Sequence, residues 1–155
     1  TFQIFVKKSV FNQSDTQQLI ERALNLNPEN NSNWGLMTVT EMLVHCNLAH
    51  QGILKATKSD KSATFRQLMF KFVFFNIKSE FPKLAKGPKR FQTAGNAPDA
   101  SFEEEKSKFI HILSKYPKID YALEASHPVF GPLTHQQWGI FVWRHVDHHL
   151  RQFGV

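Results

Sequence analysis

The sequence contains very little cysteine, since Cys46 is the only one among 155 residues. A single cysteine cannot form a disulfide within the chain, and such chains are typical of reducing compartments. Long apolar runs are also missing. The most apolar stretch, residues 68–77, is interrupted by Lys71 and Asn76 and is shorter than the ~18 residues of a membrane span. No secretory signal sequence is recognisable. We therefore predict a cytoplasmic protein that does not cross a membrane.

Concentrated positive charge is missing as well, although the formal net charge is +6. The basic residues are spread along the chain, with only a loose group between Lys78 and Arg90. Nucleic-acid binding through this charge would show as affinity that falls steeply with salt. Because no predicted helix carries a basic stripe with interleaved aromatic residues, a solvated surface explains the charge better. We expect no nucleic-acid partner.

Helix-start signals are what the sequence has in abundance. We interpret four sites where Ser or Thr is followed three residues later by Glu or Gln as capping boxes. These boxes predict helices over residues 14–25, 38–58, 101–116 and 134–153. Residues 63–78 predict a further apolar helix, with a strand as the alternative for residues 72–77. No convincing strand pair or second domain is recognisable, so we predict one all-α domain, a four-helix bundle with long connecting loops, over residues 1–155.

Residues 80–100 are rich in proline and glycine and predict a long connection. Connections of this length often cover functional sites, and this one would form a basic cover over one end of the bundle. Exposed phenylalanines from residues 65–75 would favour a homodimer.

The last helix contains the first candidate site residues. His145 and His149 are four residues apart, so they lie about 40° apart on one face, together with Trp138, Phe141 and Val142.

The second helix places His45 on its inward side, with Met42, Leu48, Ala49 and Gly52. His50 lies about 140° away from His45, and we expect it to be exposed. Three inward imidazoles predict a divalent-metal site, with Zn, Ni, Fe or Mn as the ion and water in the open positions.

Other residues near these histidines have weaker cases. His148 is the rival ligand, or a group that contacts substrate, and Gln152 lies on the histidine side. Glu41 precedes His45 by one turn and would support it or, more simply, complete the capping box. Cys46 lies about 100° from His45 and is not counted as a ligand. The simpler alternative is a hydrogen-bonded, partly exposed helix end without metal.

Two motifs resemble the DinB-like superfamily of four-helix metal-binding proteins. They are Trp-Gly-Leu-Met-Thr at residues 34–38 leading into His45, and His-Val-Asp-His-His-Leu-Arg-Gln at residues 145–152. The resemblance implies His45, His145 and His149 as metal ligands. Residues 127–134 and 137–139 are similar to an uncharacterised bacterial branch. Many relatives have Arg directly after the last His, whereas Leu150 stands there in this chain.

Characterised members of that superfamily include thiol-dependent transferases and an isomerase. The resemblance therefore implies a metal-dependent enzyme, a transferase or hydrolase, whose open coordination positions take water or a low-molecular-weight thiol and which acts on a small molecule. A non-catalytic metal- or ligand-binding module is the alternative, because a fold alone does not establish a reaction.

Overall fold

Helices dominate the computed structural model, which describes residues 7–83, 85–97 and 99–155. Within these residues there are five α-helices: α1 (Gln13–Leu24), α2 (Val39–Lys55), α3 (Phe65–Phe72), α4 (Phe102–Lys115) and α5 (His135–Gln152). The prediction of an all-α fold is confirmed apart from one short strand pair. No described helix is both long and apolar enough to cross a membrane.

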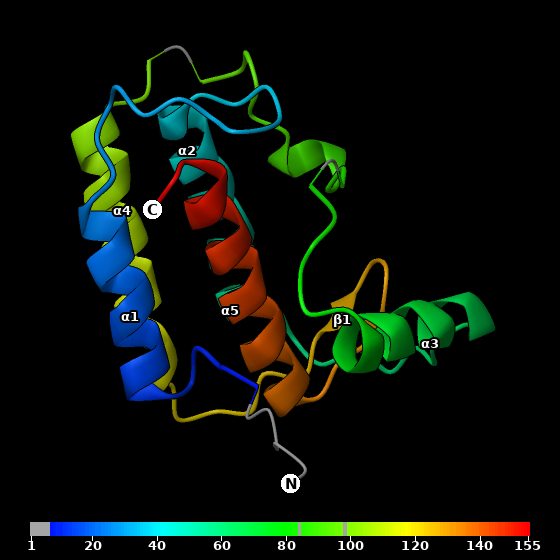
Figure 1. Ribbon diagram of the computed structural model, residues 1–155. Coiled ribbons are helices and arrows are strands. Elements are labelled where there is room, and N and C mark those ends of the chain that lie inside the picture. Colours follow the sequence, from blue (N-terminus) through cyan, green and yellow to red (C-terminus); the bar gives the residue numbers. More distant parts are fainter. Residues whose placement is uncertain (1–6, 84, 98) are drawn as a thin grey trace, which may run out of the picture.

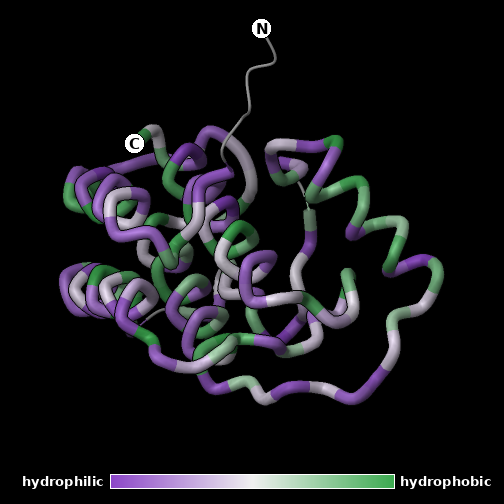
Figure 2. Tube along the Cα trace, turned by 90° about the horizontal axis from the view of Figure 1, so that it is seen from below, coloured by the Kyte–Doolittle hydropathy of each residue, from purple (hydrophilic) through white to green (hydrophobic). Residues whose placement is uncertain are grey.

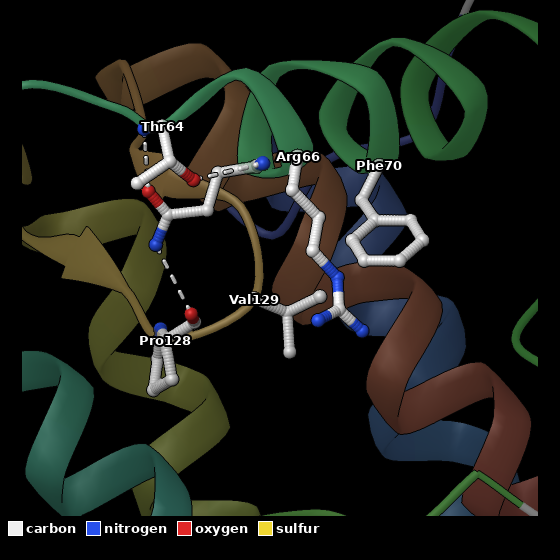
Figure 3. A pocket seen from close by; sticks show the side chains of 6 residues that line it. Thr64, Arg66, Phe70, Pro128 and Val129 are labelled. Carbon is white, nitrogen blue, oxygen red and sulfur yellow. Dashed lines mark hydrogen bonds between the residues drawn. The ribbon is translucent and has the colours of Figure 1, made fainter.

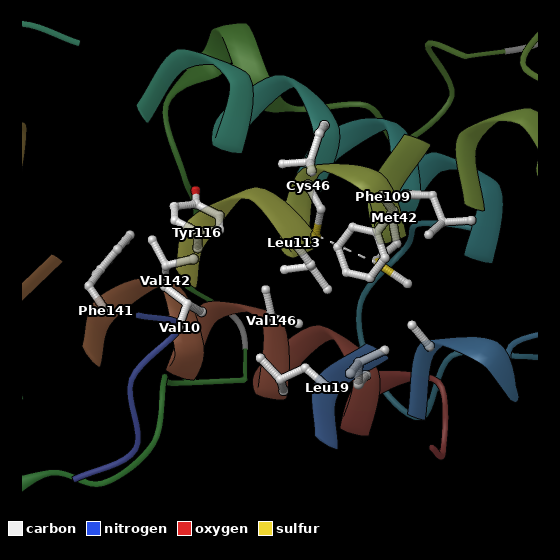
Figure 4. Close-up of a cluster of buried hydrophobic side chains, with 14 of the residues drawn as sticks. Val10, Leu19, Met42, Cys46, Phe109, Leu113, Tyr116, Phe141, Val142 and Val146 are labelled. Atoms are coloured by element: carbon white, nitrogen blue, oxygen red, sulfur yellow. Dashed lines mark hydrogen bonds between the residues drawn. The ribbon is translucent and has the colours of Figure 1, made fainter. Parts of the chain in front are cut away.

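Four of these helices, α1, α2, α4 and α5, pack against one another and form what we call the helical body (Figure 1). Its core holds side chains from all four, as Figure 4 shows; they include Leu19, Met42, Phe109, Leu113, Val142 and Val146, each completely buried. Helix α3 lies apart from the helical body, and Figure 2 shows hydrophobic residues along this outlying part.

The predicted start of the first helix is wrong. Helix α1 begins at Gln13, and its cap is Asn12, whose side-chain oxygen accepts hydrogen bonds from the backbone N–H groups of Ser14 and Asp15. Asparagine is as good a cap as serine, and it stands two residues ahead of the capping-box pattern. The boxes at Thr38 and Thr134 form as predicted.

The outlying segment also differs from expectation. Helix α3 begins with a capping box of Thr64 and Gln67, which we did not predict. It ends at Phe72, and the chain continues as a π-helical turn (Val73–Ile77). The helix packs on an antiparallel pair of two-residue strands, β1 (Ser126–His127) and β2 (Gly131–Pro132), where we expected no strands. Such short strands leave almost no alternating pattern in a sequence.

The long connection between the π-helical turn and α4 lies against α2. It contains a short 3₁₀ helix (Lys89–Phe91), and the Thr93 hydroxyl donates to the carbonyl of Glu41 at 2.6 Å. The Gly95 N–H donates to the Glu41 carboxylate at 2.7 Å. The described part of the predicted cover therefore lies over α2, and Leu84 and Pro98 are outside the described residues.

Candidate metal centre

Helix α5 supplies two of the predicted ligands. Its capping box fixes its first turn: the Thr134 hydroxyl accepts from the Gln137 N–H at 3.2 Å, and the Gln137 side chain accepts from the Thr134 N–H at 3.0 Å. Two turns later, the four-residue spacing places the rings of His145 and His149 with their centroids 4.7 Å apart.

Helix α2 supplies the third predicted ligand, His45. Its ring centroid lies 5.3 Å from that of His145 and 4.8 Å from that of His149. The Nε2 atoms of His45 and His145 are 3.3 Å apart, and one ring nitrogen from each of the three residues lies within 4.8 Å of the other two. His149 is buried, while His45 and His145 keep partial exposure.

Hydrogen bonds determine which nitrogen of His45 and His149 is free. The Nδ1 of His45 lies 2.6 Å from the Phe91 carbonyl, which can only accept, so Nδ1 carries the proton. The Nδ1 of His149 lies 2.8 Å from the Gln152 side-chain oxygen, while the Gln152 amide nitrogen donates to the Trp34 carbonyl at 2.8 Å. In both rings Nε2 is left bare, as in histidines that bind metals.

Gly35 makes the contact behind His149 possible. Its φ of +79° lies in the left-handed region, and a Cβ atom there would be 2.8 Å from the Gln152 amide nitrogen. A side chain at this position would push Gln152 away from the Trp34 carbonyl. The Trp-Gly pair in the motif at residues 34–38 therefore has a physical reason in the orientation of His149.

Burial keeps the candidate ligands neutral. It lowers the pKa of His45, and it lowers the pKa values of His145 and His149 well below the ordinary range, with repulsion from neighbouring histidines adding to the effect. The hydrogen bonds that His45 donates to the Phe91 carbonyl and His149 donates to the Gln152 side-chain oxygen oppose these shifts only in part. At neutral pH the rings are uncharged, the form that binds metal ions.

Comparison with known proteins places the chain in a family. Residues 9–154 match the family described as "Protein of unknown function (DUF1569)". The chain belongs to the DUF1569 family. No match to it was found among curated proteins or among solved structures. The DUF1569 description assigns no activity, so the chemistry of the site follows from its geometry.

In this DUF1569 chain the donor set consists of three imidazoles. Among the described residues, no cysteine or carboxylate joins them within the same reach. Cys46 points its thiol toward the Met42 sulfur at 3.8 Å, and burial raises its pKa, so it is a buried thiol rather than a thiolate. Leaving Cys46 out of the predicted ligand set agrees with this placement.

The three weaker candidates lie in different places. Gln152 stands behind His149 and orients it. His148 is 8% exposed and lies outside the converging group, with its ring centroid 5.4 Å from Trp34 and 5.7 Å from Phe81. Burial lowers its pKa to about 4.

Glu41 does not contact the ring nitrogens of His45, whose partners are the Phe91 carbonyl and His145. One carboxylate oxygen accepts from the Thr38 N–H at 2.8 Å and the other accepts from the Gly95 N–H at 2.7 Å. Both oxygens are thus occupied by the helix start and the long connection, in line with the capping-box alternative.

The predicted exposure of His50 is wrong. This residue was expected to be exposed, but it is completely buried, and its Nε2 lies 3.0 Å from Nδ1 of His145. Burial lowers its pKa to about 3, with the neighbouring His45 adding to the effect. The expectation failed because α2 is covered on several sides, by α4 as well as α5.

A hollow in the outlying segment is a separate feature. A cavity of about 380 Å³ lies between α3 and the turn after β1, lined by Thr64, Arg66, Gln67, Phe70, Pro128 and Val129 (Figure 3). Its lining contains none of the converging histidines, and Arg66 lies over the Phe70 ring at 5.3 Å. The cavity and the metal centre are built from different elements.

Proposed function

We propose that this chain is a divalent-metal-dependent enzyme of the DinB-like type, with the metal held by His45, His145 and His149. The observation that carries the proposal is the convergence of three ring nitrogens within 4.8 Å, two of which have their second nitrogen bound to a fixed oxygen acceptor. The arrangement of α1, α2, α4 and α5 supports a DinB-like four-helix bundle.

One distance between the ring nitrogens matches the edge of a metal site. Zinc binds histidine nitrogen at about 2.0–2.1 Å, so two ligands of a tetrahedral ion lie about 3.3–3.4 Å apart. The 3.3 Å between the Nε2 atoms of His45 and His145 agrees with that edge, and the ring nitrogens of all three residues lie within 4.8 Å of one another. Zn, Ni, Fe and Mn all accept imidazole ligands.

The donor set suits catalysis because three neutral ligands leave coordination positions open. A divalent ion held there would lower the pKa of a bound water or thiol and so supply a nucleophile near neutral pH. The His148 ring adjoins that of His149, and the rings of Trp34 and Phe81 adjoin His148 in turn. Together these three rings would form a wall for substrate beside the metal. A thiol transferase is the reaction that the DinB-like resemblance favours.

A non-catalytic metal-binding module is the second candidate. One observation favours it: the ligands come from α2 and α5, so a bound ion would cross-link two helices of the helical body. A purely structural ion would be lost on chelation with a large fall in melting temperature, and it would accept no thiol. A catalytic ion would leave the metal-free protein folded.

Metal content tests the site itself. The protein, purified without a histidine tag and dialysed against each of the four candidate ions, is expected to retain about one ion per chain by elemental analysis. His145→Ala should lose it. The matched control is His111→Ala, because His111 is exposed on α4. Equal metal in the wild type and His145→Ala would refute the site.

Thiol binding tests the proposed chemistry. With Co²⁺ in the site, a small thiol that occupies an open position would produce thiolate-to-cobalt charge-transfer absorption. The absorption should be absent in His145→Ala and present in His111→Ala. A metal-loaded protein that gives no such band and turns over no thiol with an electrophile would favour the non-catalytic module.

A further inference from the structure

His145 lies between two other histidine rings. Its Nε2 faces Nε2 of His45 at 3.3 Å, and its Nδ1 faces Nε2 of His50 at 3.0 Å. His50 is completely buried and does not belong to the converging group of ligands. His50 is therefore not a fourth candidate ligand, and its contact is with the candidate ligand His145.

The partner of His145 differs in kind from the partners of the other two ligands. His45 and His149 donate to oxygen atoms, which can only accept, so their protons are fixed on Nδ1. The His50 ring nitrogen can either donate or accept, depending on where its own proton lies. The contact with His50 consequently allows the proton of His145 to lie on either ring nitrogen.

Without metal, the Phe91 carbonyl determines which ring nitrogens of His45, His145 and His50 carry protons. His45 donates to it through Nδ1, so its Nε2 is bare and the proton between the two rings belongs to Nε2 of His145. The Nδ1 of His145 is then bare and accepts from Nε2 of His50. A metal on Nε2 of His145 requires the reverse order, with protons on Nδ1 of both His145 and His50.

The far side of His50 is suited to this reversal. Its Nδ1 and the Tyr116 hydroxyl are both buried and have no hydrogen-bond partner among the described residues. The two rings meet edge-on with centroids 5.9 Å apart. A hydroxyl can donate to a bare Nδ1 or accept from a protonated one, so each orphaned group is of the type that the other needs.

We propose that His50 is a positioning residue for His145. When Nε2 of His145 binds metal, Nε2 of His50 accepts a hydrogen bond from the Nδ1–H group of His145. The inference rests on the proposed metal site. Both rings stay neutral, and each moves its one proton from Nε2 to Nδ1. The hydrogen bond between them reverses direction.

The affinity for Zn²⁺, measured by competition with a chromophoric chelator, tests this role. Loss of an outer partner of a metal-bound histidine typically costs 10–100-fold in affinity, and we expect that loss in His50→Leu. In His50→Gln the amide oxygen can accept in place of Nε2, so the affinity should stay within about threefold of the wild type. His111→Leu is the matched control.

Nitrogen NMR of the unmutated protein labelled with ¹⁵N-histidine provides a test that needs no variant. On addition of Zn²⁺, the His145 and His50 rings should both change from the Nε2–H to the Nδ1–H form. A wild type that binds no Zn²⁺ would refute the metal site. Zinc binding with an unchanged His50 tautomer, or with equal affinity in His50→Leu, would refute the role of His50 alone.

Discussion

Helices α5 and α3 begin alike and end up in opposite environments. Both start with a reciprocal Thr and Gln capping box, and both carry apolar residues at helical spacing. The apolar stripe of α5 is buried: Trp138, Phe141, Val142, Val146 and Leu150. The stripe of α3 is exposed to between 49% and 78%: Phe65, Leu68, Met69 and Phe72.

The difference shows that local signals decide whether a helix forms, and its neighbours decide which face is covered. On α3 the polar side chains face the protein, because Gln67 donates to the Pro128 carbonyl and Lys71 donates to the Pro132 carbonyl. The strand pair thus offers hydrogen-bond acceptors where the helical body offers α5 an apolar groove. A helix that satisfies exposed carbonyls with its polar face must turn its apolar face outward.

The largest difference in the free energy of unfolding is expected between two Leu→Ala variants, one on α5 and one on α3. Leu150 is completely buried, so Leu150→Ala should lower the free energy of unfolding by about 2–5 kcal/mol. Leu68 is 49% exposed, and Leu68→Ala should change the free energy of unfolding by less than about 0.5 kcal/mol. Urea unfolding of the metal-free proteins measures both. Comparable losses would mean that α3 is packed as tightly as α5.

A pH effect is expected where the strand pair joins the two helices. The His127 ring stacks on Phe130 and lies against Phe141 of α5, and its Nδ1 accepts from the Val129 N–H at 3.1 Å. Burial lowers the pKa of His127 from 6.5 to about 4. The unfolded chain then binds more protons, so this contribution is present above pH 6.5 and is lost as the pH falls toward 4.

Near pH 4, the contribution of His127 to the free energy of unfolding is expected to have fallen by about 1–3 kcal/mol. His127→Gln removes the titrating ring, so the free energies of unfolding of wild type and variant should converge as the pH decreases from 7 to 4.5. Unfolding of metal-free protein over this range measures the difference. Curves that stay parallel would show that His127 takes up its proton equally in both states.

The smallest effect on stability is expected from polar substitutions on the exposed stripe. The double variant Phe65→Ser, Phe72→Ser should unfold within about 0.5 kcal/mol of the wild type. If the stripe forms the predicted homodimer, sedimentation should detect a dimer in the wild type and a monomer in the variant. Leu36→Ser, at a 91% exposed site outside the stripe, is the control. A monomeric wild type would contradict the homodimer prediction.

The sequence was sufficient to predict that His145 and His149 lie together on α5, because a four-residue spacing on a helix brings two side chains together whatever surrounds them. Placing His45 opposite them needed only that the inward face of α2 meets α5. His50 could not be placed in this way. Helix α2 is buried on more than one side, and Leu48, predicted to face inward, is 41% exposed. A single-face description of a helix fails when two neighbours cover it.

Local signals account for the fold predictions that succeeded, although two local signals, the Asn12 cap and the Thr64 capping box, were missed. Capping boxes at Thr38 and Thr134 use only residues within one turn, and they form as predicted. The strand pair and the outward stripe of α3 depend on contacts between segments about 60 residues apart, such as Gln67 with Pro128. No local pattern records such contacts.

The Phe91 carbonyl that fixes the His45 ring belongs to the backbone, so a side-chain substitution cannot remove this acceptor. Every amino acid has a carbonyl, so exchanging the side chain at residue 91 would leave the hydrogen bond in place. What matters is the path of the connection, which is attached to α2 through Thr93 and Gly95. Adding or removing one residue between the π-helical turn and Thr93 would displace the carbonyl and release His45. Loop length, rather than loop composition, is the variable that controls this side of the site.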